Sequence, residues 1–242
     1  MTRFVVYGAN RSGSHYLQSL LNNHPDIKCY WDIFWEKGNT PYCINAFLLS
    51  NNRKNVPKYF GRAKLIRKFL ENHYLISNNA SASGFLLKWS VANRYPEILK
   101  WMQSNKIRIV HIARENFLIQ QVALELRRRG IVTSHSRTDT EFNKVLIDTD
   151  NLLANLITLK NGLEAQRKKI SNHVTLEVKY ENMLIHEVTE LERIFQFLEV
   201  SKARNLKSEF NKTESEVPSL MIINYQEVYK ILENTEFSYL LR

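Results

Sequence analysis

The segment from Gly8 to Ser14 holds residue types that bind an anion. Gly8 and Gly13 fit the G-x-x-x-x-G frame of loops that join a strand to a helix and bind phosphate. Such a loop directs backbone N–H groups and a helix N-terminus at the anion. Arg11, together with Ser12 and Ser14, adds a guanidinium and hydroxyls that suit a phosphate or sulfate without a metal. The alternative is an ordinary polar turn, with a helix capped by Ser12 or Ser14.

A nucleoside triphosphatase needs two further residues directly after this frame. They are a Lys that reaches the β- and γ-phosphates and a Ser or Thr that holds Mg²⁺. This chain has Ser14 and His15 at those positions. The loop therefore predicts an anion site that departs from the pattern of a nucleotide kinase.

Strands and helices alternate along the chain, which is the pattern of an α/β fold. The anion loop follows a short apolar run that is typical of a buried parallel strand, and Pro25 ends the helix after it. The sequence predicts strands over 4–7, 27–30, 85–89, 107–112 and 174–178, helices over 17–23, 62–72, 96–104, 119–126, 152–169 and 191–198, and a loop over 78–84. We expect one domain over residues 1–242, a P-loop-like three-layer fold with a central, mostly parallel sheet flanked by helices.

Positive charge is concentrated in the central third of the chain. The 242 residues carry a formal net charge of +10, and residues 51–130 hold 16 Lys and Arg against 4 Asp and Glu. A basic surface for nucleic acid or an anionic membrane would explain this excess, and so would a pocket for a small polyanion.

The composition excludes several classes of protein. With 44% hydrophobic residues, 7 Gly and 5 Pro, the chain is neither disordered nor collagen-like. We see no apolar stretch of about 18 residues and no signal-peptide pattern. Two cysteines provide neither a disulfide framework nor a zinc site. We therefore expect a cytoplasmic protein without a transmembrane segment or a metal.

The loop and four later segments resemble sulfotransferases that use 3′-phosphoadenosine-5′-phosphosulfate (PAPS) as donor, in particular bacterial carbohydrate-type enzymes. The first segment is similar to the family motif R-S-G-S/T-x-x-L, and the second is a strand that ends in an arginine, Arg114. The segments that resemble the family, in chain order, are 11–17, 110–116, 176–183, 195–200 and 223–235.

The chain departs from the family at the site of the donor's 3′-phosphate. The family has a helix Ser eight or nine residues after the strand-end arginine, where this chain has Val122 and Ala123. Gln120, Gln121 or an arginine of 127–129 would have to substitute for it. The resemblance implies donor binding by Arg11, Ser12, Gly13, Ser14, His15, Arg114 and Gln121.

The resemblance also implies the catalytic residues. Arg11 would stabilise the charge that grows on the departing bridging oxygen. The acceptor hydroxyl needs a general base, for which Asp32 is the first candidate because related enzymes place a carboxylate after the second strand. Glu36 is the reserve, and His24 and His15 are the imidazole alternatives. Each of these side chains could equally have a structural role.

The resemblance implies transfer of a sulfuryl group to a hydroxyl of a carbohydrate, glycolipid or small alcohol, with adenosine 3′,5′-bisphosphate as product and no nucleic-acid partner. Two other functions stay open: a P-loop-like nucleotide kinase, and a catalytically degraded sulfotransferase-like protein that binds anions or nucleic acid. Lys88, at the end of a predicted strand, either lines the cleft or is an ordinary strand-end lysine, and His111 is expected in the core.

Overall fold

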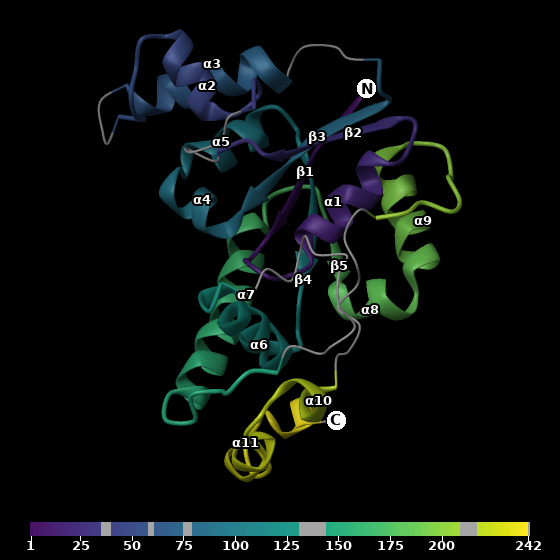
Figure 1. Ribbon diagram of the computed structural model, residues 1–242. Helices are drawn as coiled ribbons and strands as arrows, with labels where there is room; N and C mark the ends of the chain where they lie inside the picture. The colour runs from purple at the N-terminus through teal and green to yellow at the C-terminus, as the bar shows by residue number, and fades with distance from the viewer. Residues whose placement is uncertain (35–39, 58–60, 75–78, 131–143, 209–216, 242) are drawn as a thin grey trace.

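The computed structural model describes residues 1–34, 40–57, 61–74, 79–130, 144–208 and 217–241. Its centre is a parallel five-stranded sheet with the strand order β2-β3-β1-β4-β5 (Figure 1). The strands are β1 (Thr2–Gly8), β2 (Ile27–Asp32), β3 (Ala82–Lys88), β4 (Arg108–Ala113) and β5 (Thr175–Lys179). The expected α/β fold with a central parallel sheet is thus confirmed.

Helices cover both faces of the sheet, because alternate side chains of each strand point to opposite sides. In the central strand β1, Phe4 and Val6 belong to one buried cluster, and Val5 and Tyr7 belong to another. The first cluster packs against α1 (Ser14–Asn22), α8 (Tyr180–Ile185) and α9 (Glu187–Leu198). The second packs against α2 (Ile44–Ser50), α3 (Arg62–Tyr74), α4 (Trp89–Arg94) and α5 (Glu97–Ser104).

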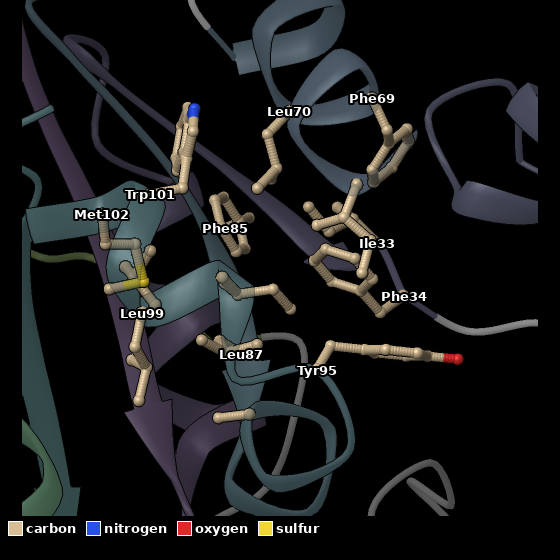
Figure 2. Packing of buried hydrophobic residues seen from close by; sticks show 14 of the residues in the cluster. Ile33, Phe34, Phe69, Leu70, Phe85, Leu87, Tyr95, Leu99, Trp101 and Met102 are labelled. Atoms are coloured by element: carbon tan, nitrogen blue, oxygen red, sulfur yellow. The ribbon is translucent and has the colours of Figure 1, made fainter. Parts of the chain in front are cut away.

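Aromatic rings contact one another within the second cluster (Figure 2). Phe34, which follows β2, lies edge-on to Phe69 of α3 with ring centroids 5.4 Å apart. It also contacts Phe85 of β3 and Tyr95 after α4, with centroids 6.5 and 6.1 Å away. Burial of such rings supplies much of the stabilisation of a core. The packing therefore fixes the chain that follows β2, directly after Asp32.

A third cluster lies beyond the end of β4. It joins α6 (Phe117–Arg128) and α7 (Leu152–Ile170) to the C-terminal α10 (Pro218–Met221), α11 (Tyr225–Leu232) and 3₁₀-helix η1 (Ser238–Leu241). Figure 1 shows α10 and α11 in yellow near α6. No helix in the described ranges is long and apolar enough to cross a membrane.

Strand β3 differs most from the sequence-based expectation. It begins at Ala82, inside the predicted loop, and ends at Lys88, so that Trp89 starts a helix. The small residues of Ala82-Ser83-Gly84 are typical of a turn, but here they allow a close approach. A Cβ atom at Gly84 would overlap the backbone oxygen and the ring of Phe4 in β1.

This close approach makes a stability prediction. Gly84→Ala should destabilise the protein by about 1–3 kcal/mol, because the extra methyl must push two neighbouring strands apart. Gly162→Ala is the matched control, since a Cβ there meets nothing within 4 Å and alanine favours the helix α7 by about 0.5–1 kcal/mol. Urea unfolding measures both variants, and equal midpoints would contradict the packing described here.

Candidate active site

The loop between β1 and α1 has the conformation of an anion-binding loop. Arg11 and Gly13 have positive φ angles of 63° and 86°. A Cβ at Gly8 would lie 2.7 Å from the Oγ of Ser12 and 2.8 Å from Cγ2 of Ile112. Both glycines of the G-x-x-x-x-G frame are therefore required by close contacts, and the backbone curls tightly around the start of α1.

The N-terminus of α1 is left open to a ligand. Gly13 is its N-cap and offers no side chain, and the first turn holds no acidic residue. Neither serine caps the helix: Ser12 donates from Oγ to the oxygen of Ala9 (2.9 Å), and Ser14 accepts from the ammonium of Lys88 (2.8 Å). Helix N-terminal N–H groups without a capping side chain are suited to an anion.

Tyr180, the first residue of α8, fixes the loop against the end of β4. Its ring lies so close to Gly13 that a Cβ there would overlap it. The guanidinium carbon of Arg114 lies 4.6 Å from the centroid of the same ring, and Nη1 of Arg114 donates to the oxygen of Arg11 (3.0 Å). The strand-end arginine and the anion loop are thus held together through one aromatic ring.

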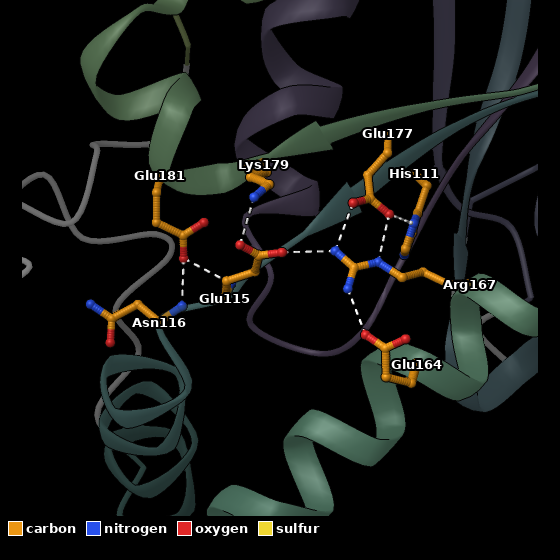
Figure 3. Close-up of polar contacts among 8 residues, drawn as sticks. All are labelled: His111, Glu115, Asn116, Glu164, Arg167, Glu177, Lys179 and Glu181. Carbon is orange, nitrogen blue, oxygen red and sulfur yellow. Dashed lines mark hydrogen bonds and ion pairs between the residues drawn. The ribbon is translucent and has the colours of Figure 1, made fainter. Parts of the chain in front are cut away.

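Glu181 positions the segment that follows Arg114. Its Oε1 accepts from the backbone N–H groups of Glu115 (2.9 Å) and Asn116 (2.7 Å), as Figure 3 shows. Asn116 then caps α6 by accepting from the N–H of Ile119 (3.1 Å). Tyr180 and Glu181 belong to the segment 176–183 that resembles the family, and they have two structural tasks: the tyrosine contacts the loop, and the glutamate orders the turn into α6.

An ion-pair network holds β4, β5 and α7 together beside this turn (Figure 3). Arg167 of α7 pairs with Glu115 (2.8 Å) and with Glu177 of β5 (2.7 Å). Glu177 also accepts from Nδ1 of the fully buried His111 (3.1 Å), and this bond together with Arg167 lowers the pKa of Glu177 to about 2. The imidazole expected in the core thus lies there and anchors the sheet.

A buried lysine bonds to the anion loop and lies near the carboxylate that ends β2. Lys88 ends β3, between β1 and β2, and its side chain is only 7% exposed. Burial lowers the pKa of Lys88 to about 8, and the nearby Asp32 opposes this shift. Burial also raises the pKa of Asp32, against the effect of Lys88. Oδ1 of Asp32 is buried and has no hydrogen-bond partner among the described residues, so it can accept a proton from a ligand.

Arg11 brings further positive charge to the loop. Its Nε donates to the oxygen of Ala123 in α6 (3.2 Å). Burial lowers the pKa of Arg11, and the like charges of Arg127 and Arg114 lower it further. The central excess of Lys and Arg is thus partly gathered around one loop, and such a cluster attracts an anion.

The other predicted residues lie in different places. His15, in the first turn of α1, stacks on Trp31 at a centroid distance of 4.5 Å. His24 precedes β2, so it lies at the amino ends of the strands, opposite the anion loop. There its Nδ1 accepts from the N–H of Asp26 (3.0 Å), and its Nε2 donates to the oxygen of Ser201 (2.9 Å). The structure does not bring His24 to the loop. Glu36 lies outside the described residues.

Helix α6 accounts for one of the two positions that lack the expected serine. Val122 is fully buried in the third cluster, so a hydroxyl at this position would face the core. Gln120 donates to the oxygen of Asn10 (2.9 Å) and thereby supports the loop. Gln121 instead lines a groove between α6 and α7. The structure thus gives the two glutamines separate positions.

Lys88 gives a pH-dependent stability prediction. Its pKa is lower in the folded than in the unfolded protein, so the unfolded state binds more protons between pH 8 and 10.5. The cost of burying the charge is fully present below pH 8 and is relieved above it. Relative to Lys88→Met, the wild-type free energy of unfolding should therefore rise by up to about 3 kcal/mol over this range.

Chemical denaturation at pH 7, 8, 9 and 10 measures this difference. The exposed Lys100→Met is the matched control, and its difference from wild type should stay constant with pH. A constant difference for Lys88→Met as well would show that Lys88 is not buried as described.

Comparison with known proteins agrees with the fold described above. The model of the sulfotransferase family matches residues 3–204. The chain is similar to the crystal structure of a sulfotransferase from Alicyclobacillus acidocaldarius (TM-score 0.51, 16% identity), with 100% of this chain and 99% of that chain covered. A sulfotransferase domain from the curacin biosynthetic pathway gives a TM-score of 0.49 and 11% identity over 92% of this chain and 84% of that one. No curated protein matches the chain. The family match extends from β1 past the end of α9, and the chain belongs to the sulfotransferase family.

Proposed function

We propose that the protein transfers a sulfuryl group from PAPS to an acceptor hydroxyl. The observation that carries this proposal is the contact of Lys88 with Ser14 beside Asp32. This contact supports the proposal because the charge of Asp32 acts on Lys88, and Lys88 bonds to an anion loop that has an uncapped helix and a fixed guanidinium. Sulfuryl transfer needs these two elements side by side: cations for the leaving group and a base for the attacking hydroxyl.

The anion loop would hold the 5′ end of the donor. Ser12, Gly13 and Ser14 supply backbone N–H groups, and the arginine at position 11 supplies a guanidinium. Arg114 would contact the 3′-phosphate, as the resemblance to the family implies. Its side chain is 4% exposed and is oriented by the Tyr180 ring, so little conformational entropy is lost when it binds.

Asp32 would accept the proton of the acceptor hydroxyl. As this proton leaves, the hydroxyl oxygen forms a bond to sulfur, and the bond between sulfur and the bridging oxygen breaks to release adenosine 3′,5′-bisphosphate. The raised pKa of Asp32 makes the carboxylate a stronger base than an exposed aspartate. Lys88, whose pKa is about 8, is mostly protonated at pH 7 and balances the charge of Asp32.

Domain organisation, location and acceptor class belong to the same proposal. The chain would act as one catalytic domain over residues 1–242, in the cytoplasm and without a metal, on a carbohydrate, glycolipid or small alcohol. The match of the family model to residues 3–204 supports the domain assignment.

Calorimetric titration with adenosine 3′,5′-bisphosphate, beside Mg-ATP, tests the donor site. We expect the bisphosphate to bind without metal with a Kd in the micromolar range or tighter. Arg114→Ala should weaken this binding by about tenfold or more and leave adenosine 5′-monophosphate much less affected, because only the bisphosphate has the 3′ group. The exposed Arg67→Ala is the matched control. Binding of Mg-ATP alone would instead support a nucleotide kinase.

Asp32→Asn tests the base. The amide cannot accept the proton, so sulfate transfer from labelled PAPS to a panel of monosaccharides and aliphatic alcohols should fall about 10²–10⁴-fold. Affinity for the bisphosphate should change little. Asp26→Asn is the control, because it makes the same change at the opposite end of β2. If Asp32→Asn retains wild-type turnover, another residue is the base.

A further inference from the structure

Three successive arginines at the end of α6 have different surroundings. Arg128 and Arg129 both pair with Glu125, at 2.8 and 3.2 Å, and Arg129 also donates to the oxygen of Leu146 (2.9 Å). Arg127 makes no ion pair or hydrogen bond with any residue that the structure describes. Of these three side chains, Arg127 therefore has a charge that no carboxylate of the described residues offsets.

Arg127 lies on the face of α6 that contacts the anion loop. Gln120 donates to the oxygen of Asn10, and the oxygen of Ala123 accepts from Arg11. Residues three or four positions apart share one face of a helix, so Arg127 follows these two contacts one turn further on. Its positive charge lowers the pKa of both Arg11 and Lys88. The guanidinium thus stands near two other cations.

A groove runs from Arg127 between α6 and α7, with a volume of about 470 Å³. Polar side chains of both helices line it, among them Gln121, Asn155 and Thr158. These amide and hydroxyl groups can hydrogen-bond an oxygen-rich ligand. Arg127, which lines this groove, therefore also stands near Arg11 of the anion loop.

Arg127 lies at the far end of α6 from the Arg114 turn. An α-helix rises about 1.5 Å per residue, so Arg127 lies about 15 Å along α6 from Phe117, which follows that turn. Arg11 lies near both arginines, because the charges of Arg127 and Arg114 both lower its pKa. The cations that Arg127 does approach, Arg11 and Lys88, lie at the end of the loop where the acceptor would meet the sulfuryl group.

We propose that Arg127 and the α6–α7 groove form a second anion site, which binds a negatively charged group of the acceptor. The acceptor is then a hydroxyl compound that also carries a carboxylate, phosphate or sulfate. This inference rests on the proposed function for the identity of the ligand. The site itself rests on the position of Arg127.

Calorimetric titration of inorganic sulfate into protein saturated with adenosine 3′,5′-bisphosphate tests the site. The bisphosphate fills the phosphate positions of the donor but leaves the sulfuryl position empty, so the dependence of sulfate binding on Arg127, and not sulfate binding alone, reports the second site. We expect wild type to bind sulfate and Arg127→Ala to lose about tenfold or more in affinity, as expected for a charge-assisted contact. Arg128→Ala is the matched control, because it removes the same charge from the next position, where Glu125 already pairs with the guanidinium, and it should retain affinity within about twofold.

A pair of acceptors tests the ligand class. With PAPS as donor, wild type should sulfate glucuronate with a higher kcat/KM than glucose, and Arg127→Ala should reduce this preference while Arg128→Ala preserves it. Three results would overturn the inference: no sulfate binding to the saturated wild type, equal losses in the two variants, or a loss of bisphosphate affinity in Arg127→Ala as large as in Arg114→Ala.

Failure of the proposed function would give a different result. Wild type would then bind no bisphosphate, and sulfate would be titrated into the unliganded protein. A loss of sulfate affinity confined to Arg127→Ala would still support the anion site, whereas equal losses in Arg127→Ala and Arg128→Ala would overturn it as well.

Discussion

The contact between Gly13 and the ring of Tyr180 is the constraint on which the rest of the site depends. It closes the loop after β1 against the start of α8, and it leaves no space for a side chain at position 13. The same ring orients Arg114, whose guanidinium holds the carbonyl of Arg11. One glycine and one tyrosine thereby set the relative positions of both expected donor-binding arginines.

Positive charge that is held without an equal number of carboxylates has an energetic cost. Burial lowers the pKa of Lys88 and Arg11, and the repulsion between them and Arg127 adds to this effect. Asp32 offsets only part of it. An anion that enters the site would relieve the repulsion, so binding energy is stored in the folded protein before the ligand arrives. The ion pairs of Arg167 with Glu115 and Glu177 differ from this cluster, because there each carboxylate offsets the positive charge.

The sequence predicts the features that depend on neighbouring residues. Apolar runs and helical spacing locate the five strands and the longer helices, and the glycine frame locates the anion loop. The contacts between distant segments were not predictable in this way. Lys88 reaches Ser14 only because β3 lies beside β1, and this strand order is not written in any local pattern. The imidazole of His24 has suitable chemistry for a base, but the residue type alone does not tell at which end of the strands the side chain lies.

The Gly13–Tyr180 contact also determines when the site can form during synthesis. The two residues are separated by most of the chain, and β5 pairs only with β4, at the edge of the sheet. A ribosome that has released the first 170 residues has delivered the loop, β3 and β4, but not the tyrosine that closes the loop. Such long-range contacts form late and slow the folding of a domain. The nascent protein can therefore pair four of its five strands before it acquires a complete anion site.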